Sequence, residues 1–466
     1  MLFNGFQFVV FFSVVFVAIR VLPPRARPGF LLVASLAFYG LWVPSALLVL
    51  GTLLALNYAL LRMIASRANR RPWLVLSIAL SLGVLAFYKY GAVALAWLRP
   101  AHPGLGPLSA RLAWTAMPLG ISFYTFEMVS LAVDVACGRL ECPSFSSYAL
   151  VVTFFPHLIS GPILRGPELI PQLARGGQMT PLRSRRGVWL FLVGLVKKVL
   201  LSDYLLQPFV AEAFDSARYS SGPVHLLGMY AFAFQIYADF SGYTDMARGI
   251  ACLLGFELPT NFREPYLSRD PTEFWRRWHI TLSRWLRDYL YVPLGGNRRG
   301  PARTSVNLFL TMALGGLWHG AGFGFLLWGA LHGLWLVLHR RVRTGKTGEE
   351  PLSVRDVARI FFTFHVVCLL WIPFRAPDLG LAAAYVRGLF TAGYLGPWPP
   401  LPLLVVALCA LLHVAERLFR PRLSGFFDWV VKSPLGPVVE GAAFGILATA
   451  AFFASGAGVQ FIYFQF

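Results

Sequence analysis

The chain has 466 residues, of which 57% are hydrophobic and only 13% are charged, and its mean hydropathy is +0.62. This composition is far more apolar than that of a soluble globular protein, so it excludes that class. The formal net charge of +20 would suit a nucleic-acid partner, but the basic residues lie in short connections between apolar runs. The positive-inside rule explains this distribution without nucleic acid, and we predict a polytopic membrane protein.

Apolar runs long enough to cross about 30 Å of hydrocarbon recur along the whole chain. They predict a single membrane domain, residues 1–466, with about eleven to thirteen transmembrane helices. No internal repeat and no long polar linker divides this domain. The expected spans lie near residues 3–19, 28–61 (two helices broken around Pro44), 73–98, 112–133, 147–163, 187–206, 222–256, 305–339, 357–374, 379–396, 401–415 and 436–454.

Six of the connections between the apolar runs are basic, and the positive-inside rule places these in the cytoplasm. One span precedes the first of them and one follows the last, so both termini are expected outside the cytoplasm. The basic connections occur at residues 20–27, 62–71, 175–186, 263–303, 340–346 and 417–432.

Segment 257–303 carries most of the side chains capable of chemistry. Aromatic and aliphatic residues recur between Asp270 and Tyr291 at helical intervals, which predicts one amphipathic helix that starts near Thr272 and carries His279. Its cationic face suits the headgroup zone of the membrane. An interfacial anchor alone and a part of a ligand site are both open interpretations. The cationic face consists of Arg276, Arg277, Arg284 and Arg287.

The sequence PLGGNRRG, residues 293–300, combines a tight Gly-Gly turn with Arg298 and Arg299. Backbone amides and guanidinium groups in such a turn suit a phosphate-bearing ligand. An ordinary basic cytoplasmic loop would have the same composition, so both interpretations stay open.

The run from residue 304 to residue 339 contains no charged residue and has arginines at both ends. As one helix it would extend about 54 Å, too long for a single span, so it predicts a hairpin. Its turn is expected among the glycines of residues 315–324, with His319 inside the bilayer. Irregular backbone at that depth must be buried in protein or line a cavity, and an intramembrane ionisable group is a functional candidate. The alternative is a buried histidine hydrogen-bonded to a carbonyl, which we expect for His332, His365 and His413.

Two further polar stretches lie within apolar sequence. In IYADFSGYTDMARG, residues 236–249, Asp245 and Arg248 are spaced to pair on one helix, and Asp239 lies six residues before Asp245. A structural role and a cavity-lining role are both open. The second stretch, residues 154–169, has two proline-centred breaks and predicts a bent or re-entrant segment.

Several motifs together resemble the membrane-bound O-acyltransferase family. They are PLGISFYTFE, FFPHLISGPILRG, LWHGAG and the long stretch YADFSGYTDMARGIACLLGFELPTNFREPYLSRDPTEFWRRWHITLSRWLRDYLYVPLGGN. Within the family the chain is most similar to the group that holds the bacterial alginate O-acetyltransferase membrane subunit and its peptidoglycan and cellulose acetylating relatives. His279 and His319 are 40 residues apart, which fits the family pattern.

The resemblance implies an all-α ring of helices around a central tunnel, with re-entrant and amphipathic interfacial helices. The acyl donor would enter from the cytoplasm and the acceptor from outside. The invariant histidine of the family corresponds to His319, and its second polar catalytic position corresponds to His279. His157 departs from the family pattern, where a lysine or another residue is expected.

The chemistry of a thioester agrees with this assignment, because the acyl group is already activated and needs only a base for the attacking hydroxyl. We predict His319 as that base and Trp318 as a wall of the site. No serine or cysteine nucleophile motif accompanies His319, which favours direct attack by the acceptor. The other predicted substrate-binding residues are Arg276, Asn297, Arg298, Arg299, Asp239 and Ser241.

The chain ends in the aromatic sequence VQFIYFQF, residues 459–466, after the expected last helix. An aromatic belt that anchors the helix at the interface is the common interpretation. The tail is also similar to the Phe-x-Tyr-x-x-Phe ending of related envelope acylation systems, which implies that Tyr463 carries the acyl group. The partner would then be a periplasmic SGNH-type acetyltransferase or a polymer-synthesis complex.

The resulting hypothesis is an O-acetyltransferase of the bacterial inner membrane. It moves an acetyl group from a cytoplasmic thioester, acetyl-CoA or another, towards an extracytoplasmic polysaccharide. The alternatives are D-alanyl transfer from a carrier protein to teichoic acid and, in a different class, a proton-coupled transporter. The five cysteines have no metal-ligand spacing, so we expect neither a metal site nor a permanently bound cofactor. Membrane lipids are expected partners.

Overall fold

The computed structural model describes residues 3, 5–98, 102, 117–215, 221–342 and 353–454. Every regular element in these ranges is a helix, and no strand occurs among them. A helix satisfies its own backbone hydrogen bonds, which an apolar chain in lipid requires. The predicted all-α fold class is confirmed.

The described helices fall into two compact units that interleave along the chain. The first comprises Met1–Phe191 with Thr244–Pro259, and the second comprises Leu192–Tyr243 with Thr260–Phe466. The long helix α11 (Gly222–Leu253) contributes to both. The single membrane domain, its ring of helices and its tunnel stay predictions.

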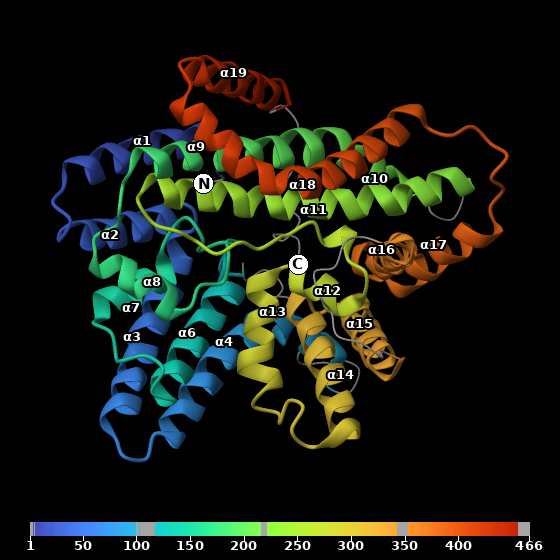
Figure 1. Ribbon diagram of the computed structural model, residues 1–466. Coiled ribbons are helices and arrows are strands. Elements are labelled where there is room, and N and C mark those ends of the chain that lie inside the picture. Colours follow the sequence, from blue (N-terminus) through green and yellow to red (C-terminus); the bar gives the residue numbers. More distant parts are fainter. Residues whose placement is uncertain are drawn as a thin grey trace. The chain divides into compact units, whose positions relative to one another are not determined.

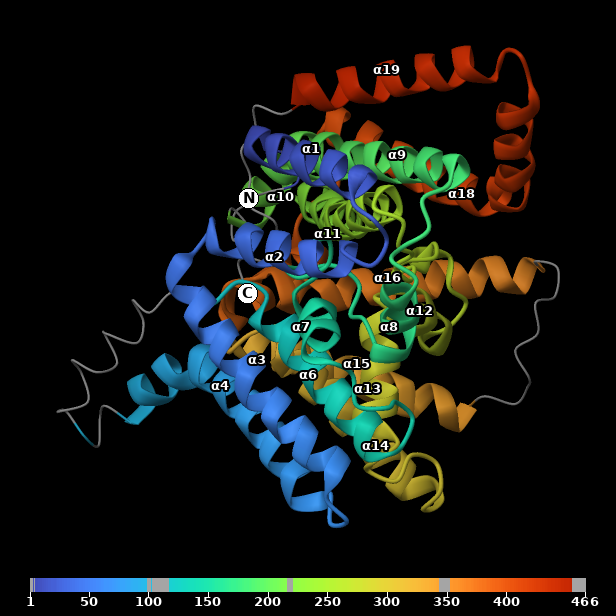
Figure 2. The same ribbon diagram turned by 90° about the vertical axis from the view of Figure 1, so that its left-hand side faces the viewer.

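The first unit is built around α3 (Pro44–Ser66), which packs beside both α4 (Arg71–Leu98) and α6 (Ile121–Ala136), as Figures 1 and 2 show. Pro44 lies in the first turn of α3, where its missing N–H costs no hydrogen bond. The expected break of the 28–61 run is therefore confirmed. The remaining helices of this unit are α1 (Phe6–Val21), α2 (Arg27–Gly40), α7 (Phe145–Thr153), α8 (Gly166–Ala174) and most of α9 (Pro181–Leu195).

Between α7 and α8 the chain is not helical although it is buried, as predicted for residues 154–169. A buried pair supports this segment: Glu127 of α6 lies 3.1 Å from His157 Nδ1 and accepts a hydrogen bond from the backbone N–H of Leu164 at 3.0 Å. His157 Nε2 lies 3.0 Å from the carbonyl of Val151. These side chains supply partners for irregular backbone inside the protein.

The second unit contains the elements that follow. They are η2 (Val196–Leu206, a π-helix), α10 (Gln207–Asp215), η3 (Pro265–Leu267), α12 (Pro271–Arg277), α13 (Ile280–Leu286), η4 (Arg287–Tyr291), α14 (Gly300–His319), α15 (Phe323–Val342), α16 (Val354–Arg375), α17 (Leu379–Thr391), α18 (Pro400–Lys432) and α19 (Gly436–Ala454).

The prediction of one continuous amphipathic helix between Asp270 and Tyr291 is wrong. The segment is divided into α12, α13 and the π-turn η4, and the break lies at His279, whose φ of 41° is left-handed. Most apolar side chains of the segment, Trp278 and Leu282 among them, are buried inside the protein. The segment bends because its side chains pack against neighbouring helices, and one straight helix on the surface would not bury them in this way.

The predicted hairpin is confirmed: α14 ends at His319, a short turn follows, and α15 begins at Phe323 and lies beside α14 (Figure 1). Glycines allow the two helices to approach closely. A Cβ atom on Gly316 would lie 2.3 Å from the Phe325 carbonyl oxygen, and one on Gly329 would lie 2.3 Å from that of Met312. This is the small-residue packing typical of membrane helices.

Within the described residues, four helical stretches are both long and apolar enough to cross a membrane: α3, α4, α16 and Pro400–Phe419 of α18. The apolar helices Phe6–Val21, Leu379–Thr391 and Gly436–Ala450 are shorter. These stretches agree with a polytopic membrane protein. The expected number of crossings stays a prediction.

Candidate active site

His319 is the last residue of α14, and the extended backbone of Gly320, with φ of −177°, ends the helix there. The imidazole is only 5% exposed. Its ring centroid lies 4.9 Å from that of Trp318, 5.1 Å from that of Trp328 and 5.2 Å from that of Phe374. His319 is therefore enclosed by three aromatic rings from α14, α15 and α16.

His279 lies in the break between α12 and α13, and it is one of two described non-glycine residues with positive φ. Such a conformation persists only where its surroundings enforce it, and it often marks a functional site. Here Asn261 enforces it. The Asn261 side-chain oxygen accepts hydrogen bonds from the Thr281 N–H at 3.1 Å and hydroxyl at 2.9 Å, and its carbonyl accepts one from the Ile280 N–H at 2.9 Å.

The same Asn261 oxygen lies 3.3 Å from His279 Nδ1. Because this oxygen only accepts hydrogen bonds, Nδ1 must carry the proton in this arrangement, which leaves a lone pair on Nε2. Burial lowers the pKa of His279 to about 3, so the ring is neutral at physiological pH. The Asn261 contact thus selects one tautomer of a neutral imidazole.

Trp318 brings the two histidines together. Its ring centroid lies 4.9 Å from that of His319 and 6.3 Å from that of His279. Phe240 of α11 packs edge-on against His279, with centroids 4.6 Å apart. The two predicted catalytic imidazoles, 40 residues apart in sequence, therefore share one aromatic neighbour.

A cavity of about 770 Å³ adjoins this region, because Ile280, the residue after His279, lies in its wall. Two predicted substrate-binding residues, Arg276 and Asn297, line it. Its walls come from α12, α13, η4, α14 and α15, and they carry four arginines. These are Arg276, Arg284, Arg287 and Arg340.

Arg298 and Arg299 do not line this cavity. Arg298 donates a hydrogen bond to the Val292 carbonyl at 3.4 Å, and Arg299 precedes the first turn of α14. Both are exposed in the loop that leads to the hairpin. If they contribute to donor binding as predicted, they contact a part of the donor that lies outside this cavity.

Asp239 and Ser241 are buried in α11 and lie outside the wall of the cavity. Asp239 forms an ion pair with Lys198 Nζ at 2.5 Å, and Lys198 also binds Asp203 at 2.8 Å. Sequence reasoning missed Lys198 because it lies in an apolar run and meets Asp239 only through the fold. In the first unit, the expected pair of Asp245 and Arg248 is confirmed at 3.2 Å.

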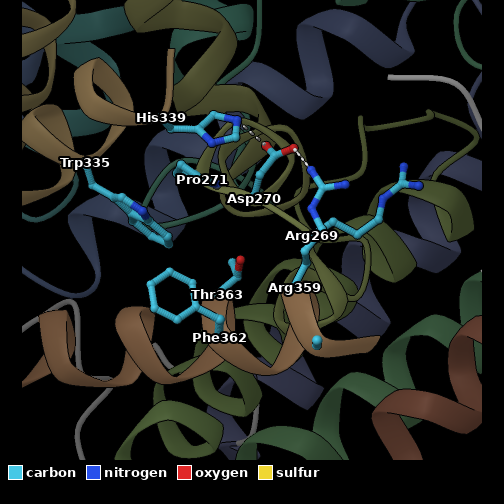
Figure 3. Close-up of a pocket in the computed structure, with 9 residues that line it drawn as sticks. Arg269, Asp270, Pro271, Trp335, His339, Arg359, Phe362 and Thr363 are labelled. Atoms are coloured by element: carbon cyan, nitrogen blue, oxygen red, sulfur yellow. Dashed lines mark ion pairs between the residues drawn. The ribbon is translucent and has the colours of Figure 1, made fainter. Parts of the chain in front are cut away.

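A second cavity, of about 330 Å³, is shown in Figure 3. Asp270 has His339 of α15 and Arg359 of α16 each at 3.8 Å, and it caps α12 by accepting a hydrogen bond from the Glu273 N–H at 2.9 Å. Asp270 thereby connects α12 with α15 and α16. His339 also lines the larger cavity, so this connection supports its wall.

The remaining histidines of the second unit behave differently from one another. His365 Nδ1 lies 2.7 Å from the Phe361 carbonyl, as expected, although the residue is only half-buried. The expected carbonyl partner of His413 is wrong, because His413 Nε2 accepts a hydrogen bond from the Tyr266 N–H at 3.3 Å. The expectation for His332 is wrong: neither ring nitrogen has a hydrogen-bond partner among the described residues. Aromatic rings, Trp275 and Trp328 among them, surround it instead. Tyr463 lies outside the described residues.

A model of the membrane-bound O-acyltransferase family matches residues 50–347. This match covers more than half of the chain, so the chain belongs to that family and is a membrane O-acyltransferase. The resemblance drawn from the motifs is confirmed. His279, His319 and all residues that line the basic cavity lie within the matched range.

Among its relatives, the chain is 38% identical to the probable alginate O-acetylase of Pseudomonas putida, over 84% of this chain and 81% of the relative. It is 34% identical to the peptidoglycan O-acetyltransferase of Helicobacter pylori, over 77% of this chain and 73% of the relative. It is 30% identical to the teichoic acid D-alanyltransferase of Streptococcus thermophilus, over 55% of this chain and 68% of the relative.

Proposed function

We propose that the protein transfers an acetyl group from a cytoplasmic thioester across the bacterial inner membrane towards an extracytoplasmic polysaccharide. The relatives with the broadest similarity are named for O-acetylation of alginate and of peptidoglycan, two polymers outside the cytoplasm. The observation that carries the proposal is the placement of His279 and His319 around Trp318, next to a cavity with four arginines.

In the proposed reaction the acceptor hydroxyl attacks the thioester carbonyl carbon directly. His319 takes the hydroxyl proton as the C–O bond forms, and it returns that proton to the thiolate after the C–S bond breaks. His279 is neutral, with its lone pair on Nε2, and accepts a hydrogen bond from a neighbouring N–H or O–H group of the bound substrates, which orients them towards each other. Trp318 and the other rings exclude water, which would otherwise hydrolyse the thioester.

The four arginines of the cavity favour a donor that carries phosphate groups. Guanidinium groups bind phosphate by charge-assisted, often bidentate hydrogen bonds. Acetyl-CoA has three phosphates, and the phosphopantetheine of a carrier protein has one. A cavity with several arginines therefore favours acetyl-CoA as the donor.

The proposal is tested with the purified full-length protein and isotopically labelled acetyl-CoA. We expect thioester cleavage by wild type, whether the attacking hydroxyl belongs to Tyr463 or to an added polysaccharide, and its loss in His319→Ala. Equal cleavage by wild type and His319→Ala would overturn the proposed role of His319.

D-alanyl transfer is the second candidate, because the teichoic acid D-alanyltransferase of Streptococcus thermophilus is also similar to the chain. A carrier-bound D-alanyl thioester offered in parallel with acetyl-CoA distinguishes the two. Faster consumption of the carrier-bound donor would show that the protein is a D-alanyltransferase and not an acetyltransferase.

For the aromatic tail we propose that Tyr463 receives the acetyl group and passes it to an external transferase of the SGNH type. Both termini would then lie outside the cytoplasm. The phenolate of a tyrosine ester is a good leaving group, so the second transfer, which returns the tyrosine as a phenol, is chemically easy. Mass spectrometry of the C-terminal peptide after incubation with labelled donor should find an acetyl group on Tyr463. If Tyr463→Phe acetylates the polymer at the normal rate, the tail is only an anchor.

A further inference from the structure

An apolar groove of about 440 Å³ lies in the second unit, between α16 and α18, apart from the candidate active site. Its walls include Val357, Phe361 and Phe364 of α16 and Ala410, Val414 and Leu418 of α18. We propose that this groove binds one acyl chain of a membrane phospholipid, and that Arg417 binds the phosphate of the same lipid.

The surroundings of the groove identify its occupant as lipid. Both walls belong to helical stretches that are long and apolar enough to cross a membrane. The wall residues are turned outward, since Val357 is 61% exposed, Phe361 65% and Leu418 60%. The neighbour of such a surface within a bilayer is hydrocarbon.

Both helices bring the groove to the same side of the membrane. Val357 lies near the start of α16, soon after the basic connection 340–346, and Leu418 lies where α18 enters the basic stretch 417–432. The positive-inside rule assigns both connections to the cytoplasm. From Val357 to Phe364, α16 rises about 10 Å, so the groove extends from the headgroup zone into one leaflet.

Arg417 supplies the charge that a phospholipid needs at the headgroup end. Its guanidinium donates one hydrogen bond, to the Leu267 carbonyl at 2.8 Å. No carboxylate whose side chain the structure describes lies within ion-pair distance of it. A guanidinium has five N–H donors, so Arg417 keeps most of its capacity for a phosphate.

The nearby arginines are already matched with carboxylates. Arg277 pairs with Glu273 at 2.7 Å and with Glu264 at 3.8 Å, and Arg269 pairs with Glu273 at 3.1 Å. Glu273 and Glu264 also act electrostatically on Arg417, but both carboxylates are engaged by Arg277 and Arg269 and neither forms an ion pair with Arg417 itself. An apolar groove with such a cation at its membrane-surface end is complementary to a single phospholipid.

The experiment is native mass spectrometry of the full-length protein, purified in detergent and incubated with phosphatidylglycerol. Wild type should retain one phospholipid saturably. Arg417→Gln should weaken this binding about fivefold. This factor corresponds to the roughly 1 kcal/mol that one basic residue contributes to binding at an anionic membrane surface. Ala410→Trp should fill the groove and abolish retention. Arg387→Gln, at an exposed position of α17, is the matched control and should bind as wild type does.

A neutral diacylglycerol separates the two parts of the proposal. It should bind wild type and Arg417→Gln equally, and Ala410→Trp not at all. The proposal is overturned if Arg417→Gln binds phosphatidylglycerol as tightly as wild type, or if Ala410→Trp retains it. It is also overturned if Ala410→Cys crosslinks to another polypeptide in native membranes, because the groove would then be a protein interface. None of these measurements depends on acyl transfer.

Discussion

The two histidines of the candidate site are held in opposite ways. Polar contacts hold His279, since Asn261 hydrogen-bonds to its ring and to the backbone on its C-terminal side. Aromatic packing encloses His319, at the end of a helix whose glycines let α15 approach closely. Hydrogen bonds select the tautomer and direction of an imidazole, whereas packing fixes its position and excludes water. The comparison agrees with the roles proposed above, an orienting group at His279 and a proton-transferring group at His319.

The largest effect is expected from His319→Ala, which removes the proposed proton-transferring group. Loss of a general base costs about 10² to 10⁴-fold in rate, so turnover should fall by at least two orders of magnitude while the protein still folds. His332→Phe is the matched control, because His332 is a buried histidine without a hydrogen-bond partner in the described part of the chain. It should stay near wild type. Turnover above about a tenth of wild type in His319→Ala would contradict the assignment.

The next largest effect is expected from Asn261→Ala, which removes the polar contacts of His279. Asn261→Ala frees the ring and the backbone around it, and outer contacts of this kind are worth about 10 to 100-fold. We expect kcat to fall by about tenfold with little change in the KM for the thioester, because the basic cavity is unaltered. A change confined to KM would show that Asn261 shapes the donor site and not the orientation of His279.

Variants of the basic cavity test whether donor binding is separate from the chemical step at the two histidines. The double variant Arg276→Gln, Arg284→Gln removes two cations from the cavity wall. Each charge-assisted hydrogen bond is worth about 1.5 to 3 kcal/mol, so KM for the donor should rise at least tenfold with kcat nearly unchanged.

Arg298→Gln with Arg299→Gln serves as the matched pair outside the cavity wall, and it should raise KM less. If both double variants raise KM equally, the loop of residues 293–300 is part of the donor site. If neither does so, the donor binds elsewhere.

The smallest effect concerns pH and stability. His279 has a pKa of about 3 in the folded protein against 6.5 for an ordinary histidine. Between these values the unfolded chain binds more protons, so this residue makes stability fall as pH drops below 6.5 towards 3. The slope is at most about 1.4 kcal/mol per pH unit.

His279→Asn lacks this titration, so its thermal midpoint should depend less on pH than that of wild type between pH 6.5 and 5. The measurement uses detergent-purified protein at a series of pH values, with His332→Phe treated identically. Parallel curves for wild type and His279→Asn would mean that His279 is solvated and not buried.

The sequence by itself determined the class of the protein and the position of its main histidine. Composition and the uncharged runs required membrane helices, and the arginines at both ends of residues 304–339 required the hairpin that carries His319. The spacing of Asp245 and Arg248 was also enough to predict their ion pair, since residues three apart on a helix lie on the same face. These features depend on length, charge and local periodicity, which are properties of the sequence alone.

Only the tertiary structure decided how the site is assembled. Helical periodicity predicted a straight helix through His279, whereas contacts from Asn261, 18 residues earlier, hold that position left-handed. The partnership of Lys198 and Asp239 likewise joins two separate helices. Local pattern does not encode such contacts because their free energy comes from groups distant in sequence. That is why the sequence supplied the two histidines and Trp318, and the fold supplied the contact of Trp318 with His279 and the cavity beside them.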